Sequence, residues 1–334
     1  MEHSRTDQIA EDGPLLFARV LDGKGGGFPI AWKDAASWQP SAPGEVLWMH
    51  LNRTHEGLYE WLQSALGIPE PTAELLTSDE TRPRAFREGS ALVATLRGIN
   101  FNPGAEPEDM VSMQLWSDGK RLLTLRRLPL QTPREILGQI DRGDGPRDAG
   151  ATITLLAELM IARMNQSIVD MNEHIDMIED MDVEEQHEQI LAKITKIRRN
   201  CLSLKRHMGP QHEALERISR DAPGWFDADD RREIAETIER LRRYLDDIDI
   251  SKESAVVLQD ELRARSLASN EHATYMLTIV AGIFLPLSFL TGLLGINVGG
   301  IPGVDDPAAF WWVAGICVFV LAVLMTLFKR WKWL

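Results

Sequence analysis

The 334-residue sequence has few cysteines, no excess of basic residues and no secretion signal at its start. Its two cysteines cannot form a disulfide framework. The opening MEHSRTDQIAEDG lacks a basic segment followed by an apolar core, so we expect no signal peptide and a start in the cytoplasm. Lys and Arg number 36 against 50 Asp and Glu, giving a net charge of −14. Nucleic-acid binding needs a basic face, so we expect no nucleic-acid partner.

The sequence also lacks the short motifs of common enzymes. It contains no GxSxG, HExxH, CxxC or EF-hand loop, and the glycine-rich run Gly23–Gly27 does not have phosphate-loop spacing, so we expect a turn or loop there. Cys201 and Cys317 are isolated, and His50 and His55 have no adjacent third metal ligand. We therefore expect no enzyme and no bound cofactor.

Two long uncharged runs lie near the C-terminus, at Met276–Ile296 and Phe310–Phe328. Each is close to the roughly 20 apolar residues that a helix needs to cross a bilayer. Buried core helices are the alternative, but two such runs in succession favour membrane spans. Tryptophans at both ends of the second run fit the interfacial belts of membrane proteins.

The charges around these runs predict their orientation. The chain ends KRWKWL, whereas the connecting loop, residues 297–309, has no basic residue and carries Asp305 and Asp306. Because basic residues remain inside, both termini are expected in the cytoplasm and the loop outside. Two spans cannot enclose a polar pathway in one subunit, so a conducting protein would have to oligomerise.

A long helix is expected to lead into the first span, because residues 227–297 contain no strong loop signal and only Pro286 among prolines. It would be roughly 100 Å long at 1.5 Å per residue. Its heptad seam begins with isoleucine and leucine and becomes small and polar toward the membrane. Several copies of this helix, from several subunits, could surround a hydrated axis. Alternatively, the helix could be a kinked, partly exposed stalk. The seam comprises Ile234, Ile238, Leu241, Leu245, Ile248, Lys252, Ala255, Gln259, Leu262, Ser266, Ser269 and Ala273.

A second helical stretch is expected over 151–208, with a break near Asp182. Its methionines are typical of gap-filling core residues. Residues 170–188 carry nine acidic residues and no Lys or Arg, which fits either a solvated hairpin or a surface that concentrates cations. His174 and His187 lie there, and neither has a histidine partner one turn away, so both are interpreted as surface residues.

The first 149 residues predict a mixed α/β domain. Runs rich in branched and aromatic residues predict strands at 15–21, 46–51, 91–99, 110–116 and 121–125, with a hairpin turn at Asp118-Gly119. Helices are expected at 56–66, 71–79 and 133–141. The predicted organisation is a cytoplasmic α/β domain (1–149), a helical stalk (150–275) and a two-helix transmembrane domain (276–334).

The junction after the first span reads Gly295-Ile296-Asn297. With the two spans, the stalk helix, Pro286 and the segment Asp79–Arg84 (DETRPR), the chain resembles the CorA family of divalent metal ion transporters over essentially its whole length. That family carries Gly-x-Asn at this junction, usually Gly-Met-Asn in magnesium transporters. Here Ile296 replaces Met and the loop continues NVGGIPG, which is similar to the ZntB branch, whose members transport zinc.

The resemblance implies a funnel-shaped homopentamer with the first span lining the pore. The family's pore-facing positions match Thr274, Leu277, Leu285, Ser288 and Asn297. The leucines would then form apolar collars that block ions when narrow, with helix packing as the alternative role. Amide oxygens of Asn297 could hold a hydrated divalent ion or coordinate it directly.

Acidic residues of the external loop would lie at the outer mouth of this pore, near Asn297. Asp305 and Asp306 could concentrate cations there, or could simply form a loop turn before Pro307. Resemblance to the zinc branch suggests proton coupling, for which the candidate titrating groups also include Glu271 and His272.

The resulting hypothesis is a proton-coupled zinc transporter of the bacterial inner membrane, with zinc as cargo and itself and membrane lipid as partners. A magnesium or cobalt channel of the CorA type is the alternative within the same class. A membrane-anchored helical scaffold or sensor is the alternative from another class, but it would not need the polar seam or the Gly-x-Asn mouth.

Overall fold

The computed structural model describes residues 13–179, 183–296 and 306–331. The chain folds into two compact units, Met1–Leu258 and Gln259–Leu334. Helices of the first unit are α1 (Trp32–Ala35), α2 (Leu58–Ser64), α3 (Glu70–Thr77), α4 (Gln131–Arg142), α5 (Ala149–Ala162), α6 (Met164–Glu179) and α7 (Val183–Asp221). Helix α8 (Ala228–Leu294) contributes to both units, and α9 (Ala309–Arg330) belongs to the second. The expected order along the chain, an α/β region followed by long helices and then two apolar helices, is confirmed.

Within the described residues, the first unit contains a mixed sheet in the order β2-β1-β3-β7-β6-β5-β4. All neighbouring strands are antiparallel except the central pair β3 and β7, which are parallel. The strands are β1 (Leu15–Leu21), β2 (Gly27–Pro29), β3 (Val46–Asn52), β4 (Arg84–Glu88), β5 (Ala91–Gly98), β6 (Val111–Ser117) and β7 (Arg121–Arg126).

The predicted strands correspond to β1, β3, β5, β6 and β7, and the predicted helices to α2, α3 and α4. The hairpin turn between β6 and β7 is also confirmed, with Gly119 at φ +88°. The sequence analysis missed α1 and both edge strands. Strand β2 has only three residues and begins at Gly27, in the run interpreted as a loop, and β4 reads RAFRE. Edge strands lack the two-sided burial that produces a recognisable apolar run.

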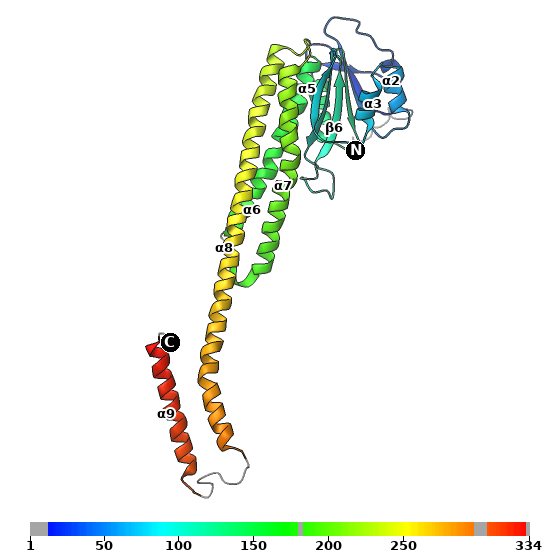
Figure 1. Cartoon of the computed structure of the whole chain (residues 1–334). Helices are drawn as coiled ribbons and strands as arrows, with labels where there is room; N and C mark the ends of the chain where they lie inside the picture. Colours follow the sequence, from blue (N-terminus) through cyan, green and yellow to red (C-terminus); the bar gives the residue numbers. More distant parts are fainter. Residues whose placement is uncertain (1–12, 180–182, 297–305, 332–334) are drawn as a thin grey trace. The chain divides into compact units, whose positions relative to one another are not determined.

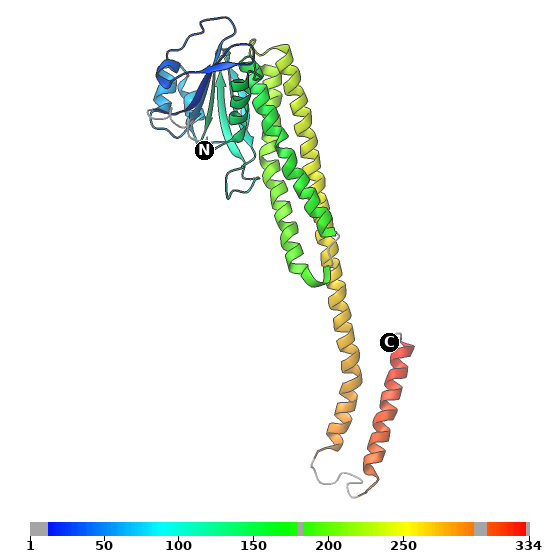
Figure 2. The ribbon, with the colours of Figure 1, turned by 180° about the vertical axis from the view of Figure 1, so that it is seen from behind.

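Helices cover both faces of the sheet (Figures 1 and 2). Alternate residues of β3 point to opposite faces: Leu47, Met49 and Leu51 join the core beneath α2 and α3. On the other face, Trp48 Nε1 donates to Thr124 Oγ1 at 2.9 Å, and His50 Nδ1 lies 2.9 Å from the same oxygen. Burial lowers the pKa of His50 to about 3, so this histidine is a neutral core residue.

The long helices differ in detail from the expected stretch over 151–208. A further break falls at Arg163, between α5 and α6, and α7 continues through Pro210 to Asp221. The expected break near Asp182 lies between α6 and α7, although Asp182 itself is outside the described residues. Met160, Met164 and Met171 are buried as expected of core residues, whereas Met177 is exposed.

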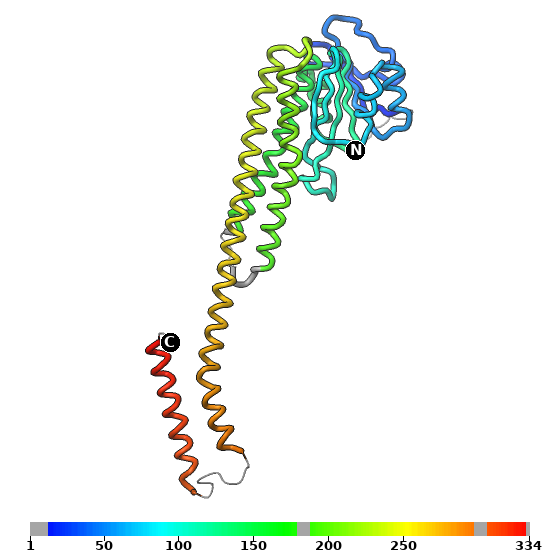
Figure 3. Tube along the Cα trace, in the orientation of Figure 1, coloured from blue at the N-terminus to red at the C-terminus, as the bar shows by residue number. Residues whose placement is uncertain are grey.

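The part of the α8 seam from Ile234 to Ala255 is largely buried within the first unit, so there the seam contacts other helices of the same chain. Ile234, Leu241, Ile248 and Ala255 are fully buried. Polar contacts also join α8 to α5, α6 and α7, where the tube of Figure 3 shows these helices side by side. These contacts are Arg240–Glu158 (3.4 Å), Ser251–Asn172 (2.6 Å) and Lys205–Asp249 (2.6 Å).

Gln211 joins α7 to the sheet. Its Oε1 accepts from the backbone N–H of Arg97 at 2.6 Å, and its Nε2 donates to the Arg97 carbonyl at 2.9 Å. Strand β4 pairs with β5 only as far as Arg84 opposite Thr95, so the Gln211 amide takes over the backbone pairing that β4 no longer provides. The Gln211 side chain is buried, where an unpaired backbone group would be costly.

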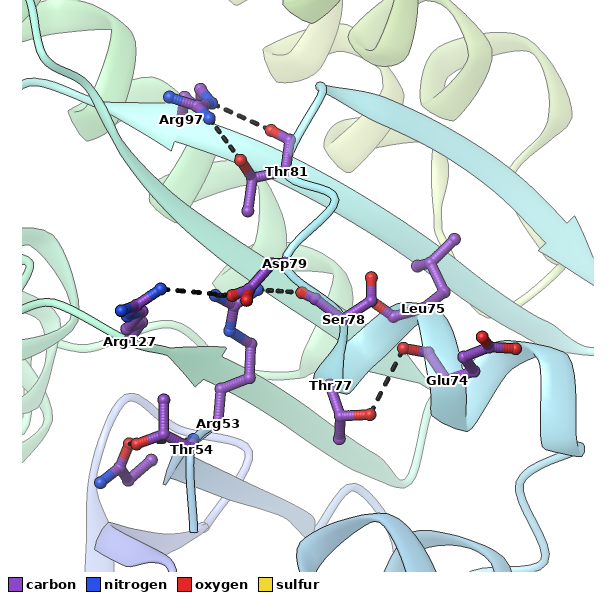
Figure 4. A network of polar contacts seen from close by, with 11 residues as sticks. Arg53, Thr54, Glu74, Leu75, Thr77, Ser78, Asp79, Thr81, Arg97 and Arg127 are labelled. Atoms are coloured by element: carbon purple, nitrogen blue, oxygen red, sulfur yellow. Dashed lines mark hydrogen bonds and ion pairs between the residues drawn. The ribbon is translucent and has the colours of Figure 1, made fainter.

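The segment Asp79–Arg84, which leads into β4, is held by arginines in or just after neighbouring strands (Figure 4). Arg53 donates to the Ser78 carbonyl and, at 3.0 Å, to Asp79 Oδ1, which Arg127 Nη1 approaches at 3.4 Å. Arg97 donates from Nε to the Thr81 carbonyl at 2.9 Å. This network fixes the course of the segment across the edge of the sheet.

The N-terminal ends of α5 and α8 meet at a buried aspartate. Asp148 Oδ1 accepts from the Ala151 N–H and caps α5, while Asp227 and Asp230 accept from each other's backbone N–H groups at the start of α8. Asp230 is 5% exposed, and burial raises its pKa to about 6. Its carboxylate lies directly against Gly150, where a Cβ atom would collide with Asp230 Oδ2.

Gly150→Ala should therefore destabilise the protein, although alanine is a better helix former than glycine. The added methyl group has to displace Asp230 and its cap, and such overpacking costs about 1–3 kcal/mol. We expect a lower thermal unfolding temperature for the full-length variant in detergent. Gly138→Ala in α4 is the matched control, because its Cβ would meet only the Arg142 guanidinium at 3.5 Å. Equal melting temperatures for both variants would contradict the proposed contact.

Candidate functional site

The second unit contains the two helices that the sequence analysis interpreted as membrane spans. The C-terminal part of α8 and all of α9 are long and apolar enough to cross a membrane. Only 6% of the apolar window of α8 and none of that of α9 is buried within the chain. Core helices of a soluble protein would be mostly buried, so this exposure favours membrane spans over the core-helix alternative.

The C-terminal part of α8 lies beside α9 (Figure 1). Ile279 and Phe328 are buried, with 5% and 6% of their surface exposed. Gly282 permits the close approach, because a Cβ atom there would lie 3.0 Å from Phe328 Cζ. One turn later, Pro286 has no N–H to donate to the Gly282 carbonyl, which weakens the helix at this point.

The predicted pore-lining residues of α8 lie on a different side of the helix from Gly282, which approaches Phe328 of α9. Because an α-helix turns about 100° per residue, Thr274, Leu277, Leu285 and Ser288 fall within one arc of about 80°. Leu277 is 70% exposed and Leu285 67%, in contrast to the buried Ile279. The fold therefore leaves this face free to contact lipid or another copy of the chain.

The end of this face that begins at Leu267 has a shallow surface recess of about 400 Å³. The recess brings Thr274 together with Glu271, one of the candidate proton-carrying residues, whereas His272 does not line it. The sequence analysis had not assigned a role to the other lining residues, although a polar residue every third or fourth position could have indicated this face. They are Leu267, Asn270, Tyr275 and Thr278.

The predicted mouth is described only in part. Gly295 ends α8 by donating its N–H to the Thr291 carbonyl at 2.9 Å, and Ile296 is 48% exposed. Asn297 and Asp305 lie outside the described residues. Asp306 Oδ1 accepts from the backbone N–H of Ala308 at 2.8 Å, so this carboxylate takes part in the turn that starts α9.

The histidines and cysteines singled out in the sequence occupy separate places. His50 is a buried partner of Thr124, and burial raises the pKa of Cys201 to about 11, so this thiol stays protonated. His187 lies among side chains that the structure does not describe. Within the described part of the chain, no group of three or more His, Cys, Asp or Glu residues could hold a metal ion.

Comparison with known proteins identifies close similarities over the whole chain. A family described as CorA-like Mg2+ transporter protein matches residues 43–330. The chain is 35% identical over 334 residues to a zinc transport protein, ZntB, of Pectobacterium atrosepticum, with all of both chains covered. It is 34% identical over 329 residues to the divalent cation transporter CmaX of Pseudomonas aeruginosa, covering 98% of this chain and 99% of that protein.

Solved structures give the same picture of the fold. The structure of the full-length CmaX protein matches with a TM-score of 0.84 at 33% identity, covering 97% of this chain and 100% of that chain. The CorA magnesium transporter from Methanocaldococcus jannaschii matches with a TM-score of 0.78, covering 95% of this chain and 99% of that chain. Its 14% identity supports likeness of fold alone.

The close approach of α8 and α9 predicts that Gly282 tolerates little bulk. Gly282→Val should push Phe328 and α9 away and destabilise the protein, because overpacking typically costs about 1–3 kcal/mol. Thermal unfolding of the detergent-solubilised protein measures the loss. Gly315→Val in α9 is the matched control, since nothing lies within 4 Å of a Cβ atom at Gly315. A melting temperature that falls as far for Gly315→Val would show that β-branching alone causes the loss.

Proposed function

The chain belongs to the CorA family of divalent cation transporters, and from that premise we propose that it transports zinc across the bacterial inner membrane. The ion would pass along the axis of a homopentamer lined by the C-terminal part of α8. One observation carries this proposal: the face of α8 with Thr274, Leu277, Leu285 and Ser288 is exposed, while a different side approaches α9.

The composition of that face supports a pathway better than a lipid contact. A purely lipid-facing side would gain nothing from the hydroxyl groups of Thr274 and Ser288, whereas a pore can use them as polar stations between apolar collars. Leu277 and Leu285 would form two such collars, which exclude ions by dewetting when the pore is narrow. A single pair of helices cannot close around an ion, so this use of the face requires several copies.

The mouth of the proposed pore is the Gly295-Ile296-Asn297 junction. Asn297 would contribute a ring of neutral amide oxygens, which bind a divalent cation loosely enough to release it again. Asp305 and Asp306 would raise the local concentration of cations, although one Asp306 oxygen also accepts from Ala308. With this loop outside, both termini would lie in the cytoplasm.

The choice of zinc is supported by the full-length similarity to a zinc transport protein, and Ile296 at the mouth agrees with that branch. A broader divalent-cation transporter that also carries magnesium or cobalt is the second candidate. It is favoured by 34% identity to the divalent cation transporter CmaX, which is nearly as high.

Proton coupling is the remaining part of the proposal. Movement of zinc needs an energy source, and the sequence contains no phosphate-loop motif for ATP. Glu271 is the first candidate to carry the proton, since it lines the same recess as Thr274. His272 and the aspartates of the loop are the other candidates.

Uptake into proteoliposomes tests the function. Zinc, magnesium and cobalt are compared, with a pH gradient imposed or removed. We expect zinc to enter fastest and its uptake to respond to the gradient. Equal uptake of all three ions, independent of pH, would favour the broader channel instead. Native mass measurement tests the assembly, and a stable monomer or dimer would exclude the axial pore.

Replacement of a collar leucine should ease ion passage. Leu277→Ser and Leu285→Ser each remove an apolar ring, so we expect zinc flux to rise severalfold. Leu293→Ser is the matched control, because Leu293 is an exposed leucine (53%) of the same span on another side of α8. Flux that stays unchanged in both collar variants, with normal assembly, would mean that these leucines contact lipid.

Removal of the Asn297 amide should abolish transport without loss of assembly. Asn297→Ala deletes the proposed oxygen ring, and a loss of about 1.4 kcal/mol in ion binding already means a tenfold change. We therefore expect uptake to fall by about tenfold or more, while the mass and melting temperature persist. Asn297→Asp keeps the geometry and adds charge, so zinc should bind more tightly and its flux should become pH-dependent. Normal uptake by Asn297→Ala would identify Asn297 as a structural residue.

A further inference from the structure

The first unit has a pocket of about 240 Å³ that the transport proposal does not use. Arg82 and Pro83, which precede β4, form one wall together with Arg84, the first residue of β4, and the middle of α7 forms the other, with Pro210 and Arg217. Glu80 and Glu213 also line it. From these residues we infer that the pocket binds a small anion that bears a phosphate group.

Arginine donors without acceptors are the first reason. Arg84 Nη2 forms an ion pair with Glu80 Oε2 at 3.0 Å, but neither this nitrogen nor Arg84 Nε has an aligned hydrogen-bond acceptor, and both atoms are buried. Buried donors in folded proteins almost always have partners, because an unsatisfied one costs about 1–3 kcal/mol. Neither Arg82 nor Arg217 forms an ion pair with the residues that the structure describes.

The arrangement of these arginines favours a phosphate group. Guanidinium groups bind phosphate and carboxylate through paired N–H donors. Here they come from two walls, Arg82 and Arg84 from the start of β4 and the residues before it, and Arg217 from α7. A tetrahedral phosphate can accept from both walls at once, whereas a planar carboxylate directs its oxygens to one side. Buried Pro83, together with Pro210 in the opposite wall, gives the pocket a stiff rim.

The charge balance predicts a weak site that one substitution should strengthen. Three arginines face two glutamates, so a single positive charge is in formal excess, and we expect weak binding. Glu213 lies on the α7 wall beside Arg217 and would repel the ligand. A phosphate group bound in this pocket would connect the edge strand β4 to α7, the long helix that packs against it.

Titration of the full-length protein with inorganic phosphate tests this inference. Line broadening in 31P NMR measures the dissociation constant, in zinc-free buffer and a phosphate-free detergent, at constant ionic strength set with chloride. Arg217→Ala should weaken binding by about tenfold, the change expected when a charged hydrogen bond is lost. Glu213→Gln should tighten it severalfold, a gain that loss of folding cannot mimic.

Two exposed residues of the same helix that do not line the pocket provide controls. Arg220→Ala and Glu216→Gln change charge on α7 in the same way and should leave the dissociation constant within about twofold. The affinity for glycerol 3-phosphate is compared with that for inorganic phosphate. Tighter binding of glycerol 3-phosphate would identify a phosphate monoester as the ligand, and equal binding would identify free phosphate. The inference is overturned if binding does not saturate, if acetate competes as well as phosphate, or if the control variants change affinity as much. Zinc uptake does not enter any of these outcomes.

Discussion

The apolar surface that the chain leaves unburied is the constraint on which the second unit depends. Almost none of the apolar windows of α8 and α9 is covered by the chain itself. Burial of apolar surface contributes about 25 cal/mol per Å², so such helices need a membrane, further copies of the chain, or both. The packing of Gly282 against Phe328 covers one side of α8 and leaves the side with Leu277 and Leu285 open. That side of α8 is therefore available to contact lipid or further copies of the chain.

In the first unit, polar side chains connect neighbouring elements at places where apolar side chains would leave backbone groups without hydrogen-bond partners. Gln211 completes the backbone pairing of β5 beyond the end of β4, and the arginines around Asp79 hold the segment that leads into β4. Asp230 performs a similar task where α5 and α8 begin, and Gly150 makes room for its carboxylate. Each contact joins a helix or connecting segment to its neighbours, so movements of the long helices would reach the sheet edge through them.

Strongly patterned segments could be predicted from the sequence, and marginal ones could not. The central strands were recognised because burial on both faces requires continuous apolar runs such as VLWMHLN in β3. The edge strands β2 and β4 were missed because a strand that is partly solvated does not need that pattern. The α8 seam was recognised as a heptad, but a heptad does not say which helix covers it. The structure assigns the part from Ile234 to Ala255 to the same chain.

The sequence by itself determined the class of the protein. Two uncharged runs long enough to cross a bilayer, a Gly-x-Asn junction after the first and a basic ending after the second are local features, and each is legible without a fold. The tertiary structure decided which side of α8 is free, that His50 and Cys201 are core residues, and that Arg82, Arg84 and Arg217 share one pocket. Those facts depend on residues far apart in the chain that the fold brings near one another, such as Gly282 and Phe328, or Arg84 and Arg217 in the lining of one pocket. Such proximity leaves no local pattern, because only the packed fold brings the partners together.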